Sequence, residues 1–523
     1  MKAGEASTAD SSPDSTAGFI VKCRSLLLAA ALGAATVAGF APFDFYFVPW
    51  LTLAALIWLW RRAASPKTAA YTGFAFGGGL FGAGVSWVYV SLHDFGGMPA
   101  PVAVPATALL CAFLAFFPAV AGWCAARWGG TSKWNFIAVT AATWTLAEWA
   151  RGWLLTGFPW LAIGYSQVPS SPLAQFAPLA GVYGISFVLM LLAELLAEFA
   201  ASLRTAPRQA ALLLLPVAAL LGLGPLAGLT QWTTKVGDPV TVTLLQGNIP
   251  QDLKFRDDFM PRTLRTYVDL TLASRSRLTI LPESALPLFR HEVPEDLLRL
   301  FAEHGRSNGG DVLAGMFDLD RDSGAIYNTM FSFGSAPTQT YRKHHLVPFG
   351  EFIPLKSLIG WVYDSILHMP LADQARGPRV QEPMNVAGQR VAMDICYEDA
   401  FGEEIIRQLP QATLLVNVSN DAWFGDYVAP WQHTQIAQTR ALETGRWMLR
   451  ATNTGITSII DDRGVVVAHA PPQQAASLSG ITQGRSGATP YVRFGNAPVI
   501  ALCLLIFAGA AWARRRAGAT PPS

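Results

Sequence analysis

The sequence predicts a helical membrane domain with several spans, joined to an α/β domain that lies outside the membrane. Charged residues make up 14% of the 523 residues and hydrophobic ones 51%, whereas a soluble chain usually carries about 25% charge. Long apolar stretches fill most of the chain before residue 230 and recur once near its end. Residues 231–495 instead alternate short β-rich runs with amphipathic helical patterns, which indicates a sheet covered by helices.

The apolar stretches set the expected domain boundaries. Residues 1–18 have no apolar periodicity, and we expect a disordered cytosolic tail. Residues 19–230 should form a membrane domain with seven transmembrane helices, and residues 496–513 an eighth, because roughly 20 apolar residues cross a bilayer core. Residues 514–523 would be a second cytosolic tail. The predicted spans lie near residues 25–43, 47–60, 69–92, 102–126, 134–150, 172–203, 209–229 and 496–513.

Basic residues set the expected orientation, because they collect on the cytosolic side of membrane proteins. Clusters near residues 22–24, 61–67, 127–133, 204–208 and 514–516 share one side if there are eight spans. Both termini are then cytosolic, and residues 231–495 lie in the periplasm of a Gram-negative cell. Arg151 falls on the outer side. We interpret Glu148 and Arg151 as a local ion pair at the outer interface, with lipid-headgroup contact as the alternative.

The predicted α/β domain contains eight recognisable strands and four helices. The strands are expected at Val240–Leu245, Leu278–Leu281, Asp311–Gly315, Tyr327–Phe333, Arg390–Ile395, Thr413–Val418, Thr457–Ile460 and Val465–Ala468. The helices are expected at 258–274, 294–304, 401–408 and 431–450. Ligands of such sheets bind beyond the carboxyl ends of the strands.

Three polar residues follow predicted strands or the loops after them: Glu283, Lys343 and Cys396. Their types suit acyl transfer. A carboxylate can take the proton of a thiol, and an ammonium can lower the pKa of the thiol and stabilise an oxyanion. The alternatives are a buried structural thiol, a structural acid and a solvated loop lysine, and residue types alone do not separate them.

The local sequence favours the catalytic interpretation. Leu281-Pro-Glu283-Ser, Tyr341-Arg-Lys343-His-His-Leu-Val-Pro-Phe-Gly-Glu351 and Asp394-Ile-Cys396-Tyr-Glu398-Asp occur in this order. Together they resemble the carbon–nitrogen hydrolase (nitrilase) superfamily and, more narrowly, the apolipoprotein N-acyltransferases. The segment Arg151–Trp160 and the word Gln246-Gly-Asn-Ile-Pro-Gln251 strengthen the resemblance. It implies eight transmembrane helices and a nitrilase-like αββα sandwich.

The resemblance also implies roles for the residues. Glu283 would be the general base, Lys343 the oxyanion stabiliser and Cys396 the nucleophile. Glu351 would either orient Lys343 or touch substrate. Tyr397 and Glu398 would support the nucleophile. One departure is Phe255, which stands where some members have a tryptophan.

The implied reaction has two halves. Cys396 takes an acyl chain from a phospholipid, phosphatidylethanolamine being the expected donor. The resulting thioester passes the chain to the α-amino group of a diacylglyceryl-cysteine at the N-terminus of an apolipoprotein. We expect no cofactor, no metal and a monomer. The net charge of +2 gives no reason to expect a nucleic acid partner.

Two rival functions stay open at this point. A membrane-tethered amidohydrolase would use water as the second nucleophile. A transporter or receptor would only bind a ligand, but charges inside the spans are nearly absent. We also expect residues 343–370, which are rich in apolar side chains, to form an arm on the membrane that gates the site.

Overall fold

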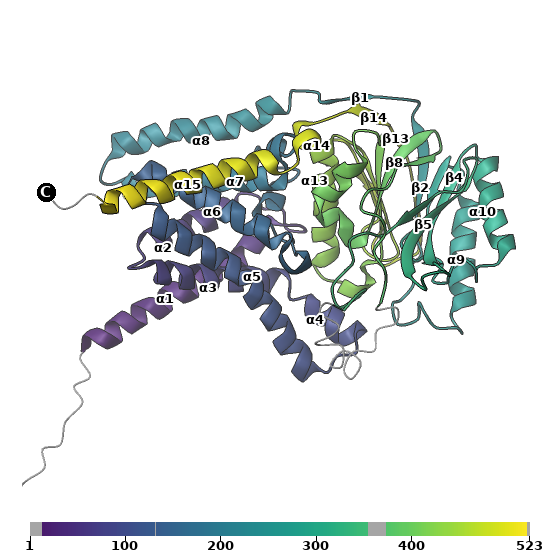
Figure 1. The fold of residues 1–523 in the computed structure, drawn as a ribbon, viewed down its shortest axis with the longest axis horizontal. Helices are drawn as coiled ribbons and strands as arrows, with labels where there is room; N and C mark the ends of the chain where they lie inside the picture. The colour runs from purple at the N-terminus through teal and green to yellow at the C-terminus, as the bar shows by residue number, and fades with distance from the viewer. Residues whose placement is uncertain (1–12, 131, 354–372, 520–523) are drawn as a thin grey trace, which may run out of the picture.

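The apolar stretches form a bundle of helices that lies beside a two-sheet α/β unit (Figure 1). The structure, a computed structural model, describes residues 13–130, 132–353 and 373–519, so most of the predicted arm at 343–370 lies outside the described residues. Helices occupy all eight predicted apolar stretches. They are α1 (Pro13–Thr36), α2 (Val48–Arg61), α3 (Pro66–Gly84), α4 (Val88–Val90), α5 (Ala100–Trp128), α6 (Lys133–Arg151), α7 (Ala177–Ser202), α8 (Pro207–Ala227) and α15 (Ala497–Ala519).

Several of these helices could cross a membrane. Four are long and apolar enough in the described chain: Ala100–Trp128, Ala174–Ser202, Pro207–Ala227 and Ala497–Arg516. The pair Pro66–Gly84 and Val88–Phe95, bent by 58°, adds a fifth if it forms one span. The apolar parts of α1 and α2 are shorter. The chain is therefore a membrane protein with several candidate spans, and the count of eight crossings stays a prediction.

The α/β unit is built from two mixed six-stranded sheets. Their orders are β13-β2-β3-β4-β5-β6 and β12-β11-β10-β9-β8-β7, and β1 pairs with β14 separately. Strands β2, β3 and β4 are parallel, as are β8, β9 and β10. The strands are β1 (Thr233–Lys235), β2 (Val240–Gln246), β3 (Leu278–Ile280), β4 (Asp311–Leu319), β5 (Ile326–Gly334), β6 (Thr340–Arg342), β7 (Met384–Val386), β8 (Gln389–Ile395), β9 (Leu414–Ser419), β10 (Met448–Thr452), β11 (Ser458–Ile460), β12 (Val466–His469), β13 (Ala476–Thr482) and β14 (Arg485–Gly487).

Helices cover the outer faces of both sheets. Helices α9 and α10 cover the sheet that contains β2 to β6, on the side far from the bundle (Figure 1). Helix α13 lies between the sheet that contains β7 to β12 and the bundle. This arrangement confirms the predicted αββα sandwich. The helices of this unit are α9 (Met260–Ala273), α10 (Glu295–Ser307), α12 (Gly402–Ile405), α13 (Ala429–Thr444) and α14 (Pro490–Phe494).

One predicted helix was too long. The helix expected at 431–450 ends at Thr444, and residues Met448–Thr452 form β10 in the middle of a sheet. Gly445 ends the helix because it adopts φ +61°, the left-handed conformation that glycine tolerates best. The sequence did not predict β10 because it contains Arg450, and a charged residue is not expected in a strand buried on both faces.

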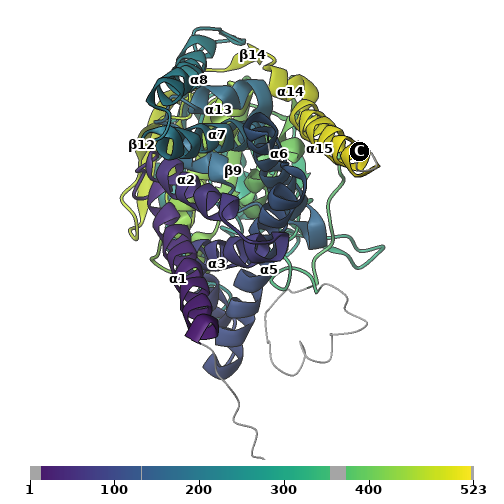
Figure 2. The same ribbon diagram turned by 90° about the vertical axis from the view of Figure 1, so that its left-hand side faces the viewer.

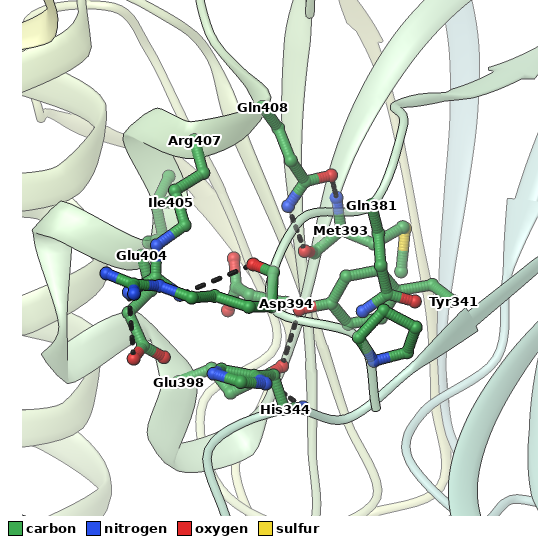
Figure 3. Close-up of a pocket in the computed structure, with 12 residues that line it drawn as sticks. Tyr341, His344, Gln381, Met393, Asp394, Glu398, Glu404, Ile405, Arg407 and Gln408 are labelled. Atoms are coloured by element: carbon green, nitrogen blue, oxygen red, sulfur yellow. Dashed lines mark hydrogen bonds and ion pairs between the residues drawn. The ribbon is translucent and has the colours of Figure 1, made fainter. Parts of the chain in front are cut away.

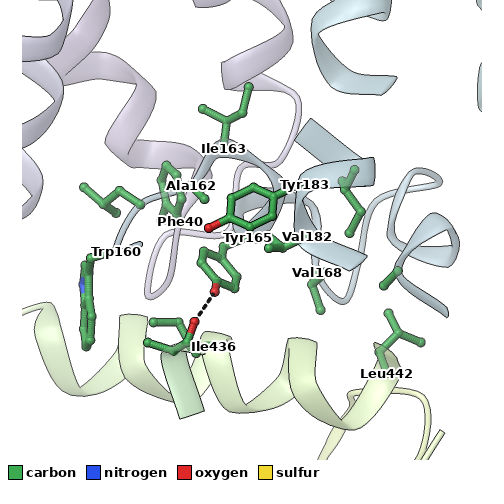
Figure 4. Close-up of a cluster of buried hydrophobic side chains, with 14 of the residues drawn as sticks. Phe40, Trp160, Ala162, Ile163, Tyr165, Val168, Val182, Tyr183, Ile436 and Leu442 are labelled. Atoms are coloured by element: carbon green, nitrogen blue, oxygen red, sulfur yellow. Dashed lines mark hydrogen bonds between the residues drawn. The ribbon is translucent and has the colours of Figure 1, made fainter. Parts of the chain in front are cut away.

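The helical bundle and the α/β unit share one hydrophobic core across α13. Side chains from the loop after α6 and from α7, including Ile163, Tyr165 and Val182, pack onto Ile436 and Leu442 of α13 (Figure 4). Viewed from the helical end, the α/β unit lies directly behind the helices (Figure 2). The two parts are therefore packed together as one body.

Buried polar groups fix this interface. The backbone N–H of Val182 in α7 donates to the Glu443 carboxylate at 2.7 Å, and the Arg440 guanidinium donates to the same oxygen at 3.1 Å. The Trp160 indole donates to the Gln432 side chain at 2.7 Å. Glu443 has no exposed surface, so these donors have no water to replace it.

Glu443→Ala should destabilise the protein strongly. The substitution leaves the Arg440 charge buried and unpaired, which costs about 3–5 kcal/mol. We expect the midpoint of thermal unfolding in detergent to fall by roughly 3–5 °C, because the entropy of unfolding of a chain this long is about 1.1 kcal/mol/K. The matched control is Glu382→Ala, because the Glu382 side chain is 87% exposed and pairs with Arg390 at 3.8 Å. That surface pair should contribute less than about 1 kcal/mol. Equal midpoints for the two variants would show that the interface does not depend on Glu443.

Candidate active site

The loops after three strands bring the predicted triad to one edge of the sandwich. Glu283 follows β3, Lys343 follows the short strand β6, and Cys396 follows β8. The Lys343 ammonium lies 3.5 Å from the Glu283 carboxylate. The charges of Glu283 and Lys343 both act on the Cys396 thiol. The structure therefore assembles the three residues that the sequence singled out.

Lys343 is held as a buried cation between two carboxylates. Its side chain is 1% exposed, and its ammonium donates to Glu351 at 2.7 Å. Burial opposes the charge, but Glu351 and Glu283 outweigh burial and raise the pKa of Lys343 above its usual value. Of the two roles left open for Glu351, the structure shows the contact with Lys343. The second oxygen of Glu351 accepts from the Val347 N–H at 2.8 Å, which fixes the carboxylate in place.

Glu283 is fixed by neutral donors as well as by Lys343. One oxygen accepts from the Asn328 amide at 2.7 Å, and the other accepts from the Asn420 N–H at 2.9 Å. Glu283 is 6% exposed. A carboxylate with so little freedom can exchange a proton only with groups already beside it.

Cys396 sits on a strained turn. Its φ is +57°, in the left-handed region that non-glycine residues rarely adopt, and such strain costs about 1–3 kcal/mol and clusters at functional sites. Burial, together with the Glu283 charge, raises the pKa of the thiol above its usual value, while Lys343 lowers it. At rest the residue is therefore a thiol, and it needs a base.

Glu398 joins the nucleophile turn to the lysine loop. Its carboxylate accepts from the N–H groups of His344 at 2.7 Å, His345 at 3.0 Å and Ile395 at 2.7 Å. The Tyr341 hydroxyl donates to it at 3.0 Å. Figure 3 shows Glu398 beside His344 and Tyr341, in a pocket that these three residues help to line. Glu398 therefore holds Lys343 in register with Cys396.

Tyr397 points toward the helical bundle instead of the triad. Its hydroxyl donates to the Gly157 carbonyl at 3.0 Å, and its ring stacks with that of Trp160 at 6.4 Å between centroids. Both partners lie in the loop after α6. The membrane part of the chain thus supports the residue next to the nucleophile.

Glu148 and Arg151 also contact the loop after α6, in a way that differs from the prediction. Both side chains are buried, at 5% and 2% exposed. Arg151 donates to the carbonyls of Phe158 and Trp160, each at 2.6 Å, and Glu148 accepts from the Ile163 N–H at 2.8 Å. The predicted ion pair at the outer interface is wrong, because both groups bond to the loop backbone that supports Tyr397.

Sequence reasoning missed a buried charge cluster beneath Cys396. Arg450 pairs with Asp399 at 3.2 Å and Asp421 at 2.8 Å, and His433 bonds to both carboxylates, at 2.9 and 3.0 Å. Burial and Arg450 lower the pKa of His433, but Asp399 and Asp421 outweigh them and raise it to about 9. The imidazolium therefore donates from both nitrogens. His433 Nε2 also lies 3.3 Å from the Cys396 carbonyl oxygen.

Lys254 was also missed. It is 2% exposed, and its ammonium donates to the Glu283 backbone carbonyl at 3.2 Å. The sequence offered one signal for these buried charges, namely a charged residue beside apolar ones, as with Arg450 in Met448–Thr452 and Lys254 between Leu253 and Phe255. Phe255 itself packs against Phe317, with 6.3 Å between ring centroids. In the described ranges, no group of three or more His, Cys, Asp or Glu side chains could hold a metal ion.

Comparison with known proteins places the chain in a family. Residues 32–195 match the model of the apolipoprotein N-acyltransferase N-terminal domain, and residues 241–491 match that of the carbon–nitrogen hydrolases. The chain is 55% identical to an apolipoprotein N-acyltransferase of Nitrosomonas europaea, over 94% of this chain and 98% of the relative. It is 46% identical to one of Methylococcus capsulatus (95% and 97% covered) and 43% identical to one of Chromobacterium violaceum (98% and 99% covered). The chain belongs to the apolipoprotein N-acyltransferase family.

Proposed function

We propose that this chain moves an acyl group from a phospholipid, through a thioester on Cys396, to the α-amino group of the diacylglyceryl-cysteine that begins an apolipoprotein. The observation that carries the proposal is the buried assembly of Glu283, Lys343 and Glu351 against a strained cysteine. The named relatives support the acceptor, and the membrane helices that pack against the site support a lipid donor.

In the first half-reaction, Glu283 takes the thiol proton and Cys396 attacks the ester carbonyl carbon of the phospholipid. The carbonyl oxygen becomes an oxyanion, and the Lys343 ammonium stabilises it. The tetrahedral intermediate then expels the glyceryl oxygen, which takes the proton from Glu283. A lysophospholipid leaves, and a thioester remains on Cys396.

In the second half-reaction, the neutral α-amino group of the apolipoprotein attacks the thioester carbonyl. Lys343 stabilises the oxyanion again, and Glu283 takes a proton from the attacking nitrogen. The Cys396 thiolate leaves as the amide forms and recovers its proton from Glu283. Glu351 keeps Lys343 in place throughout, while Tyr397 and Glu398 hold the turn.

The fold suits substrates that stay in the membrane. Each buried methylene of an acyl chain is worth about 0.8 kcal/mol, so neither the donor nor the acceptor leaves the bilayer readily. We propose the domain division stated above, a bacterial inner-membrane location, a periplasmic α/β domain, cytosolic termini and a monomer. The basic clusters and the packing of the α/β unit on the bundle support this placement. Phosphatidylethanolamine is the proposed donor.

Intact mass measurement tests the thioester directly. Wild type incubated with phosphatidylethanolamine should gain the mass of one acyl chain, and Cys396→Ala should gain none. Addition of a diacylglyceryl-cysteine peptide should discharge the adduct, because its amine attacks the thioester. Cys503→Ala is the control, since it removes a buried thiol from a different part of the chain.

The same measurement separates the rival functions. An adduct that water discharges as fast as the peptide does would indicate an amidohydrolase. The absence of an adduct with every phospholipid tried would contradict a thioester mechanism.

Glu283→Gln should slow the acyl transfer chemistry without slowing alkylation of the Cys396 thiol. Loss of the general base should slow formation of the acyl-enzyme by about 100-fold or more. Alkylation of Cys396 by iodoacetamide should stay equal or become faster, because the Glu283 charge raises the pKa of the thiol in wild type. Both rates can be read by mass spectrometry of the same samples. Parallel losses in both rates would mean that Glu283 shapes the site without carrying a proton.

A further inference from the structure

Lys254 lies where three loops of the site are joined by hydrogen bonds. It belongs to the loop after β2, at the same strand ends as Glu283. In this loop, Gln251 accepts from the Asn420 amide at 2.7 Å, and the Asn420 N–H donates to the Glu283 carboxylate at 2.9 Å. The Lys254 ammonium donates to the Glu283 carbonyl oxygen at 3.2 Å. Its charge interacts with both Glu283 and Cys396.

The Lys254 ammonium is buried, with the Glu283 carbonyl oxygen and the Phe255 ring, 5.9 Å from the ammonium to the ring centroid, beside it. An ammonium carries three donors, and a buried charge is usually paired. No carboxylate of the described residues lies within ion-pair distance of Lys254, whereas Lys343 pairs with both Glu283 and Glu351. Burial lowers the pKa of Lys254 to about 8, although the charges of Glu283 and Cys396 oppose this shift. The side chain therefore keeps capacity for a negative charge that is absent at rest.

A charge count shows what Lys254 contributes. Glu283, Glu351 and Lys343 together carry a net charge of −1 when all three are ionised. The cluster beneath them is balanced, since Arg450 and protonated His433 offset Asp399 and Asp421. A protonated Lys254 makes the group of Glu283, Glu351, Lys343 and Lys254 neutral, with Glu398 outside this count because burial raises the pKa of Glu398 to about 7. The group then stays neutral when the thiol proton moves to Glu283 and Cys396 becomes a thiolate.

We propose that Lys254 is a positioning residue for the acyl transfer reaction, whose positive charge stabilises the Cys396 thiolate and whose hydrogen bond fixes the backbone of Glu283. The inference deepens the proposed function and rests on it only for the identity of the acyl donor. Its charge is present below about pH 8 and is lost as the pH rises through that value, so at alkaline pH the thiolate keeps the charges of Lys343 and Arg450 but loses that of Lys254.

Alkylation of Cys396 by iodoacetamide measures this effect without any acyl donor. The full chain in detergent would be alkylated at about pH 6.5 to 10, and the Cys396 peptide quantified by mass spectrometry. Lys254→Met removes the charge and keeps the length, and Lys254→Arg keeps a charge that does not titrate here. Lys235→Met is the control, because it removes an exposed lysine of the same domain. Thermal unfolding would be recorded for each variant.

Charge stabilisation has a distinct signature. At about pH 7, Lys254→Met should be alkylated about tenfold more slowly than wild type, the effect of one pKa unit. Lys254→Arg and Lys235→Met should stay within about twofold. Above about pH 9, wild type should approach Lys254→Met. The alkylation rate of wild type should rise with pH less steeply at about pH 8 than at lower pH, because Lys254 loses its charge there. The rate of Lys254→Arg should show no such change of slope. The wild-type profile by itself therefore tests the inference even if a variant fails to fold.

Other results would overturn the inference. Coincident profiles of all four proteins would show that Lys254 does not act on the thiol. An Arg variant that unfolds normally but is as slow as the Met variant would show that shape matters and charge does not. Acyl-enzyme formation is scored separately with phosphatidylethanolamine. If it fails in wild type while the alkylation pattern holds, the proposed function is wrong and the role of Lys254 stands.

Discussion

Arg450 lies in the central strand of a buried sheet and has no exposed surface, so its guanidinium must be neutralised from within the protein. Asp399 and Asp421 do this, and they also hold His433 as an imidazolium. Asp399 follows Cys396 by three residues, and His433 reaches the Cys396 carbonyl. Compensation of one buried charge therefore fixes both ends of the nucleophile turn and allows it to keep a left-handed residue.

The buried carboxylates near the reacting groups are likewise compensated by donors from within the protein. Loops of the site donate to carboxylates of other loops, with the Asn420 N–H and the Lys343 ammonium bonded to Glu283 and the His344 N–H to Glu398. Buried carboxylates need such donors, and the donors come from the backbone as often as from side chains. Preorganisation of this kind costs nothing at the moment of reaction. The thiol stays protonated at rest because burial and the Glu283 charge raise its pKa more than Lys343 lowers it.

Much of this arrangement could be predicted from the sequence, because it lies in short words with local physical meaning. Apolar length located the helices, alternating patterns located eight strands, and Glu283, Lys343 and Cys396 stood after strands. Other features depend on tertiary structure and have no local signal. Strand β10 was missed because Arg450 is compensated by residues distant in the chain. The ion pair expected of Glu148 and Arg151 was wrong because both side chains find backbone partners in a loop that only the fold brings near.

The support of Tyr397 by Gly157 and Trp160 has a consequence for biosynthesis. The loop after α6 is synthesised about 240 residues before the nucleophile turn that it contacts, and α15, the last helix of the bundle, follows afterwards. The ribosome therefore completes one wall of the site long before the opposite wall exists. Until both are made, the surface of the loop that later packs against Tyr397 and α13 has no partner within the chain. Each new molecule thus passes through a stage in which its membrane part is complete except for α15 and its reactive centre is not yet formed.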